Sequence, residues 1–169
     1  MAYLRSSDSM QIFRIVTRKW KGQAFSGEGA RIYGGRWNPK GTAIVYTAAS
    51  RALALLEMLV QDEPLRAAYW IIPATIPDTV RIEQVTLNSL PHNWTTFAQG
   101  EALWAIGRAW IARGKSAVLA VPSAVMPAET NYLLNPLHPD FGQIQIEKAQ
   151  KLQTNVRLLR KFPGYPSLR

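Results

Sequence analysis

The stretch ALALLEMLV, residues 52–60, contains one charged residue, Glu57, among eight apolar ones. The run predicts a helix that is buried on most of its sides, because a helix that is apolar all round packs into a core. An ionised glutamate is almost never fully buried without a partner. We therefore expect Glu57 to meet a cation, hydroxyl groups or a ligand at the edge of a cleft. A buried ion pair without chemistry is the alternative, and Arg14 is its natural cation.

The elements predicted around this helix indicate an α+β fold. Ser50 suits the N-cap of the helix, which ends near Gln61, and a second helix runs from about residue 99 to 113 with Gly114 as its stop. Two separated helices among several short strands favour mixed or antiparallel sheets over alternating βα units. No repeat or linker interrupts residues 1–169, which predicts a single domain. The predicted strands are residues 11–16, 43–47, 69–76, 80–85, 116–121, 132–134 and 143–146.

The composition predicts a packed, intracellular protein without a metal site. The chain is 47% hydrophobic and has six tryptophans, which argues against disorder. It has no cysteine, which excludes disulfides, thiolate catalysis and zinc–thiolate sites. Only His92 and His138 could serve a histidine-built metal site, and His138 reads as a loop residue. No apolar run of membrane-spanning length and no signal peptide is apparent, so we expect a cytoplasmic protein without a membrane partner.

The net charge of +9, from 20 basic and 11 acidic residues, is unevenly placed. Residues 1–40 hold eight lysines and arginines, and the tail at residues 148–169 holds six with no acid. Such a surface favours a nucleotide, a nucleic acid or an acidic protein as partner. A non-catalytic basic binding module is therefore an alternative, but motifs for direct nucleic-acid binding are missing.

The glycine-rich segment 21–41 is the strongest candidate for a functional loop, since it holds six of the eleven glycines. Residues 27–29 (GEG) do not form a dinucleotide fingerprint, because the third glycine is misplaced. Residues 34–38 (GGRWN) are more informative: the paired glycines permit close backbone approach, and Arg36 offers a planar fork for a phosphate or carboxylate. The alternative is a surface turn with Trp37 in the core.

The spacing of three side chains suggests one cleft. Tyr46 ends a predicted strand, and a short connection leads to the helix of Glu57, so that Arg36, Tyr46 and Glu57 can face each other. The alternative for Tyr46 is a half-buried strand aromatic with a satisfied hydroxyl. Ser123 lies outside any nucleophile-elbow pattern, which argues against a serine hydrolase.

These motifs resemble the RES domain family in order and spacing, over roughly residues 10–160. The family members are toxins of bacterial toxin–antitoxin pairs with a fold similar to the ADP-ribosyltransferase toxins. The matching positions are Gly27, Gly29, Ala30, residues 34–38, Gly41, Tyr46, Glu57, residues 121–123 (VPS) and residues 135–136 (NP).

The resemblance implies that the chain consumes NAD+ without a metal. Family members degrade NAD+ by hydrolysis or phosphorolysis at the nicotinamide–ribose bond, and some transfer ADP-ribose to a protein instead. It also implies an Xre-type antitoxin that blocks the active site and makes any contact with DNA.

The resemblance further assigns roles to individual residues. Cleavage at the ribose passes through an oxocarbenium-like state, which a carboxylate such as Glu57 can stabilise. Arginines would neutralise the pyrophosphate, Tyr46 would line the nicotinamide pocket, and Ser123 would bind ribose or carboxamide. The expected catalytic residues are Glu57, Arg36 and Tyr46, and the expected substrate-binding residues are Arg14, Arg36, Tyr46, Ser123 and Asn135.

Overall fold

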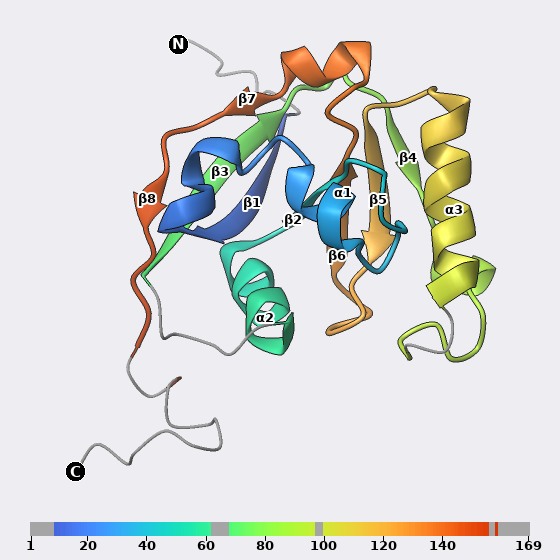
Figure 1. Cartoon of the computed structure of the whole chain (residues 1–169), viewed down its shortest axis with the longest axis horizontal. Helices are drawn as coiled ribbons and strands as arrows, with labels where there is room; N and C mark the ends of the chain where they lie inside the picture. Colours follow the sequence, from blue (N-terminus) through green and yellow to red (C-terminus); the bar gives the residue numbers. More distant parts are fainter. Residues whose placement is uncertain (1–8, 62–67, 97–99, 156–157, 159–169) are drawn as a thin grey trace, which may run out of the picture.

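The computed structural model describes residues 9–61, 68–96, 100–155 and 158 (Figure 1). Its eight strands form one sheet in the order β4-β5-β6-β2-β1-β3-β7, and β8 pairs with β3. The strands are β1 (Met10–Thr17), β2 (Val45–Ala48), β3 (Tyr69–Ile76), β4 (Ile82–Gln84), β5 (Val118–Pro122), β6 (Thr130–Leu134), β7 (Gln145–Ile146) and β8 (Gln150–Lys151). The helices are α1 (Glu28–Tyr33), α2 (Arg51–Gln61) and α3 (Gly100–Arg113), with 3-10 turns η1 (Arg18–Gln23), η2 (Leu87–Ser89) and η4 (Pro139–Gln143).

The predicted α+β class is confirmed, although the strands belong to one sheet and not to several short ones. Among the strands of the described residues, β4 and β5 alone pair in parallel, and every other pair is antiparallel. The Ser50 hydroxyl accepts a hydrogen bond from the Leu53 N–H, as expected for an N-cap. The prediction missed η1 and α1, which are too short for a helical periodicity, and the two-residue β8 in the basic tail. Residues 156–157 and 159–169 of that tail lie outside the described residues.

The sheet is nearly divided between β1 and β2. β1 pairs with β3 along all of its eight residues, but it pairs with β2 only at Phe13 and Ala48. Alternation along β1 places Phe13 on the face covered by α2, where it packs with Ala48 and Leu53. Ile12 and Val16 lie on the opposite face, in the cluster that Trp20 of η1 covers. The two halves of the sheet therefore meet at a single residue pair.

The helix of Glu57 is less buried than its sequence predicts. Only Leu53 and Ala54 of α2 are buried, whereas Leu56 is 37% and Val60 62% exposed. The expectation of a helix buried on most sides is wrong, because α2 packs one stripe against β1 and β2 and presents its other side outward. The charge of Glu57 is consequently placed at the border of the core and not inside it.

Helix α3 lies beside β4 and β5 and fixes the glycine-rich loop (Figure 1). The predicted second helix is confirmed, and its Leu103 and Trp110 are buried in one cluster with Trp37. A Cβ atom on Gly107 would lie 1.8 Å from the Trp37 carbonyl oxygen, so the loop backbone rests directly on the helix. The Trp104 indole N–H donates a 2.8 Å hydrogen bond to the Gly35 carbonyl.

We predict that Gly107→Ala destabilises the fold although alanine is the better helix former. The added methyl group cannot share space with the Trp37 carbonyl, and overpacking of this kind costs roughly 1–3 kcal/mol. The melting temperature should fall by about 2–4 °C for each kcal/mol lost. Gly29→Ala in α1 is the matched control, because its new Cβ would meet no atom within 4 Å. Equal melting temperatures for the two variants would contradict this packing.

Candidate active site

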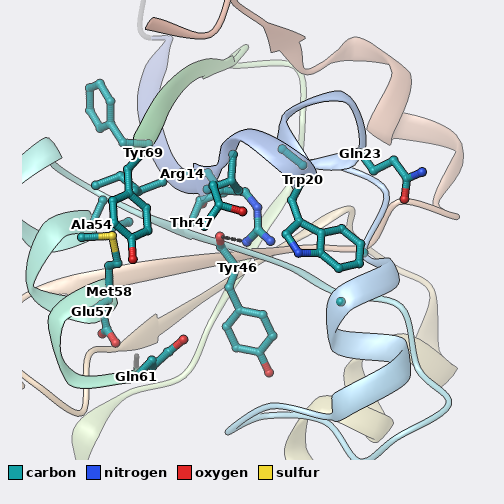
Figure 2. Close-up of a pocket in the computed structure, with 18 of the residues that line it drawn as sticks. Arg14, Trp20, Gln23, Tyr46, Thr47, Ala54, Glu57, Met58, Gln61 and Tyr69 are labelled. Carbon is teal, nitrogen blue, oxygen red and sulfur yellow. Dashed lines mark hydrogen bonds between the residues drawn. The ribbon is translucent and has the colours of Figure 1, made fainter. Parts of the chain in front are cut away.

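A pocket of about 420 Å³ opens where β1 and β2 diverge. It is lined by Phe13 and Ala54 from the face that α2 covers, and by Val16 and Trp20 from the opposite side of the sheet. Figure 2 shows Arg14 and Tyr46 near its middle. Trp20 and Gln23 lie on one side of them, and Glu57, Met58 and Gln61 lie on the other. The pocket therefore has an aromatic end and a carboxylate end with a cation between them.

Glu57 is held by neutral donors. Its Oε1 atom accepts hydrogen bonds from the Ser123 hydroxyl, at 2.6 Å, and from the Asn131 side-chain amide. The alternative of an ion pair with Arg14 is not realised, because no salt bridge joins Glu57 to a cation among the described residues. Hydroxyl and amide groups are its partners instead. Within the described part of the chain Oε2 makes no hydrogen bond, and Glu57 lines the pocket, so this oxygen is available to a ligand.

Ser123 supports Glu57 from behind. Its side chain is completely buried and does not line the pocket. The hydroxyl donates to Glu57 and accepts 3.1 Å hydrogen bonds from the N–H groups of Val125 and Met126. One donor and two acceptor positions exhaust a serine hydroxyl. The structure thus places Ser123 where it positions the carboxylate, and not at the pocket surface where a ribose contact was predicted.

Arg14 brings to the pocket a positive charge that pairs with no carboxylate among the described residues. Its Nη1 donates a 2.7 Å hydrogen bond to the main-chain carbonyl of Tyr46 (Figure 2). Its Nε is buried and has no hydrogen-bond partner among the described residues. Burial lowers the pKa of Arg14 to about 10, so the guanidinium remains charged at neutral pH. A buried cation without a carboxylate is costly and favours an anionic ligand.

Tyr46 lines the pocket, and two hydrogen bonds hold its hydroxyl in place. The hydroxyl accepts from the Trp37 N–H at 3.0 Å and donates to Asn38 Oδ1 at 2.6 Å. A Cβ atom on Gly35 would lie 2.5 Å from this oxygen, so only glycine leaves room for it. Burial raises the pKa of Tyr46, and the nearby charge of Arg36 opposes the rise. The alternative from the sequence, a half-buried strand tyrosine whose hydroxyl is hydrogen-bonded within the protein, is therefore the one observed.

Like Ser123, two further predicted site residues lie outside the pocket lining. Arg36 donates from Nη1 to the carbonyls of Thr95, at 3.1 Å, and Trp94, at 3.4 Å. Asn135 is buried in a turn, where its Oδ1 accepts from the Leu137 N–H at 3.0 Å. The structure brings Arg14, Tyr46 and Glu57 together, but it gives Arg36 and Asn135 hydrogen bonds that stabilise loops.

Asn131 is a pocket residue that the sequence-based prediction missed. It lies on β6 two residues before Leu133, which places both side chains on the same face of the sheet. The predicted strand at residues 132–134 began one residue too late to include it. Had it begun earlier, the alternation with buried Leu133 would have marked Asn131 as an inward-facing polar residue.

A family model described as RES domain matches residues 11–156 of the chain. The chain belongs to the RES domain family. Prs ADP-ribosylating toxin of Sphingobium sp. (strain YBL2) is 39% identical to this RES protein over 155 residues, which cover 88% of the chain and 96% of the relative. Toxin Res of Photorhabdus laumondii is 37% identical over 134 residues, covering 78% and 85%. The resemblance inferred from the sequence motifs is confirmed.

The fold of this RES domain is also found in a solved structure. The crystal structure of the M. tuberculosis MbcT–MbcA toxin–antitoxin complex contains a chain that matches with a TM-score of 0.71 at 21% identity. The match covers 87% of the present chain and 86% of the other.

Among the described residues, no helix is long and apolar enough to cross a membrane. The same residues contain no group of three or more histidine or acidic side chains that could hold a metal ion.

We predict that Tyr46→Phe lowers the free energy of unfolding at pH 7 by about 1–3 kcal/mol, because Asn38 and the Trp37 N–H lose a buried partner. The loss should shrink at alkaline pH. The folded-state pKa of Tyr46 is raised above the unfolded value of about 10, so the tyrosine's contribution is complete below pH 10 and declines as the pH rises further.

Urea unfolding of both proteins between pH 7 and 11 measures this difference. Tyr33→Phe is the control, since Tyr33 is 70% exposed and should leave the free energy of unfolding near that of the wild type. A wild-type advantage over Tyr46→Phe that stays constant up to pH 11 would contradict the buried, protonated hydroxyl.

Proposed function

We propose that this RES toxin degrades NAD+ by cleaving the bond between nicotinamide and ribose, with water or phosphate as the acceptor. The observation that carries the proposal is the state of Glu57. One oxygen is fixed by Ser123 and Asn131, and the other has no partner in the described part of the chain. The same pocket contains Arg14, which pairs with no carboxylate there. Such a pair of charges suits a substrate with an anionic pyrophosphate and a ribose that becomes positive.

In this mechanism the electrons of the N-glycosidic bond leave with nicotinamide, whose ring becomes neutral, and the ribose becomes an oxocarbenium-like cation. Glu57 Oε2 accepts a hydrogen bond from a ribose hydroxyl, and the carboxylate stabilises the cation electrostatically. Water or phosphate then forms a bond to the ribose C1, and water loses a proton in the process. Because nicotinamide departs neutral, a strong general acid is not required.

The other residues bind the substrate in this proposal. Arg14 offers Nε, which has no partner among the described residues, to the pyrophosphate through a charge-assisted hydrogen bond. The ring of Tyr46 lies against the nicotinamide, because its hydroxyl is already occupied. Arg36 does not contact the substrate but stabilises the loop that holds Tyr46, and Asn135 stabilises a turn.

We predict that Glu57→Gln lowers the rate of nicotinamide release from NAD+ by about 100-fold or more, because the amide removes the charge that faces the ribosyl cation. Chromatography of the products measures the rate. Glu101→Gln on the exposed side of α3 is the control and should retain the wild-type rate. Turnover of Glu57→Gln within a few-fold of the wild type would refute the assigned role.

The products of the same reaction identify the acceptor. Mass spectrometry distinguishes ADP-ribose from its 1-phosphate when phosphate is present.

The name of the Sphingobium relative favours a second candidate function, the transfer of ADP-ribose to a protein. In that case labelled NAD+ marks a protein band in a lysate, and the marking requires Glu57. A simple hydrolase or phosphorylase gives no such band.

We also propose that an Xre-type antitoxin covers the pocket in the cytoplasm and makes any DNA contact. An unregulated NAD+-consuming enzyme would kill its own cell, and the similar MbcT is known in a complex with its antitoxin. Carboxylates of the antitoxin would be attracted by Arg14 and Lys19 in the pocket and by the chain's net charge of +9.

The stoichiometric complex should release nicotinamide at least tenfold more slowly than the free toxin, because a blocked pocket admits no NAD+. Nicotinamide release by the two purified preparations is the measurement. The Glu57→Gln toxin should still bind the antitoxin, which separates binding from turnover. A fully active complex would contradict the proposed blocking of the pocket.

A further inference from the structure

The orientation of the Asn131 side-chain amide follows from its contact with Glu57. Its amide contacts Glu57 Oε1, and a carboxylate oxygen can only accept a hydrogen bond, so the NH2 group must face Glu57. The oxygen Oδ1 therefore points away from this contact. Asn131 lines the pocket, and Oδ1 is buried without a hydrogen-bond partner among the described residues.

A buried amide oxygen without a hydrogen-bond donor destabilises the fold, because its hydrogen bonds to water are lost and none replaces them. In the described part of the chain only two buried side-chain atoms are left without a partner, Asn131 Oδ1 and Arg14 Nε, and both residues line the same pocket. One is an acceptor and the other is a donor. A ligand that satisfies both must carry a hydrogen-bond donor near Glu57 and an acceptor near Arg14.

The geometry points to Asn131 as a substrate-binding residue whose Oδ1 accepts a hydrogen bond from a hydroxyl of the nicotinamide ribose. This inference rests on the proposed function, in which the pyrophosphate lies at Arg14 and the ribose at Glu57. The Asn131 amide group thus has two roles. Its Nδ2 fixes the carboxylate, and its Oδ1 binds the sugar that this carboxylate acts on.

Ser123 provides a matched control for these two roles. Both residues donate to the same oxygen of Glu57. Ser123 has no hydrogen-bonding capacity left, because Val125 and Met126 occupy its acceptor positions. Asn131 lines the pocket, and its Oδ1 has no partner among the described residues. Loss of either side chain disturbs Glu57, but only the loss of Asn131 should change how the protein distinguishes one sugar from another.

The experiment compares NAD+ with two analogues that lack either the 2′- or the 3′-hydroxyl of the nicotinamide ribose. For each protein, kcat/KM for nicotinamide release gives the preference for NAD+ over each analogue. Asn131→Ala should reduce the preference for one hydroxyl by about five- to tenfold relative to the wild type, as expected for one neutral hydrogen bond. Ser123→Ala should lower kcat/KM while keeping the wild-type preference.

Asn131→Asp keeps an oxygen directed at the sugar but loses the amide donor. It should therefore retain the preference for that hydroxyl while turnover falls, because two carboxylates then face each other. Unchanged preferences in Asn131→Ala for both analogues would overturn the proposal, whatever happens to the rate. If the alanine variant does not fold, the preferences of Asn131→Asp and Ser123→Ala for NAD+ over the analogues are compared instead.

A binding measurement separates this inference from the proposed reaction. In a Glu57→Gln background, calorimetry gives the Kd of NAD+ and of each analogue without turnover. Absence of nicotinamide release by the wild type, together with an Asn131-dependent preference in Kd, would refute the reaction and leave the sugar contact standing. Nicotinamide release without that preference would refute the sugar contact alone. Absence of NAD+ binding would refute both.

Discussion

The single pairing of Phe13 with Ala48 is the constraint on which the rest of the site depends. Where β1 and β2 separate, main-chain groups that a complete sheet would pair need other partners. Arg14 supplies one, because its guanidinium donates to the Tyr46 carbonyl. The same separation creates the pocket and lets side chains from both faces line it. A continuous ladder between these strands would satisfy the backbone and leave no room for a ligand.

Glu57 shows why neutral donors suit this pocket better than an ion pair. A pairing cation would offset much of the negative charge that the proposed ribosyl cation is to meet. Ser123 and Asn131 hold one oxygen without cancelling that charge. The exposed outer side of α2 lowers the cost of the arrangement, since the carboxylate stays near solvent. The apolar run suggested a buried charge, but the helix keeps Glu57 at the border of the core.

Local pattern predicted much of the fold and part of the site. Strand β3 and the N-cap at Ser50 follow from residue type and period, and Glu57 was expected to need polar partners. The prediction could not tell that Arg36 and Asn135 bind loop carbonyls and amides, because a motif identifies residues and not the direction of their side chains. Asn131 and the opening between two strands depend on register, which a single sequence does not reveal.

The residues 34–38 act on Tyr46 and not on the pocket directly. Gly35 makes room for the Tyr46 hydroxyl, and Trp37 and Asn38 bind it. Helix α3 holds this loop through the indole of Trp104. Since the Tyr46 carbonyl in turn receives Arg14, a continuous set of contacts joins α3 to the cation of the pocket. Rigid support of this kind is what a site needs when Arg14 and Glu57 come from opposite faces of a divided sheet.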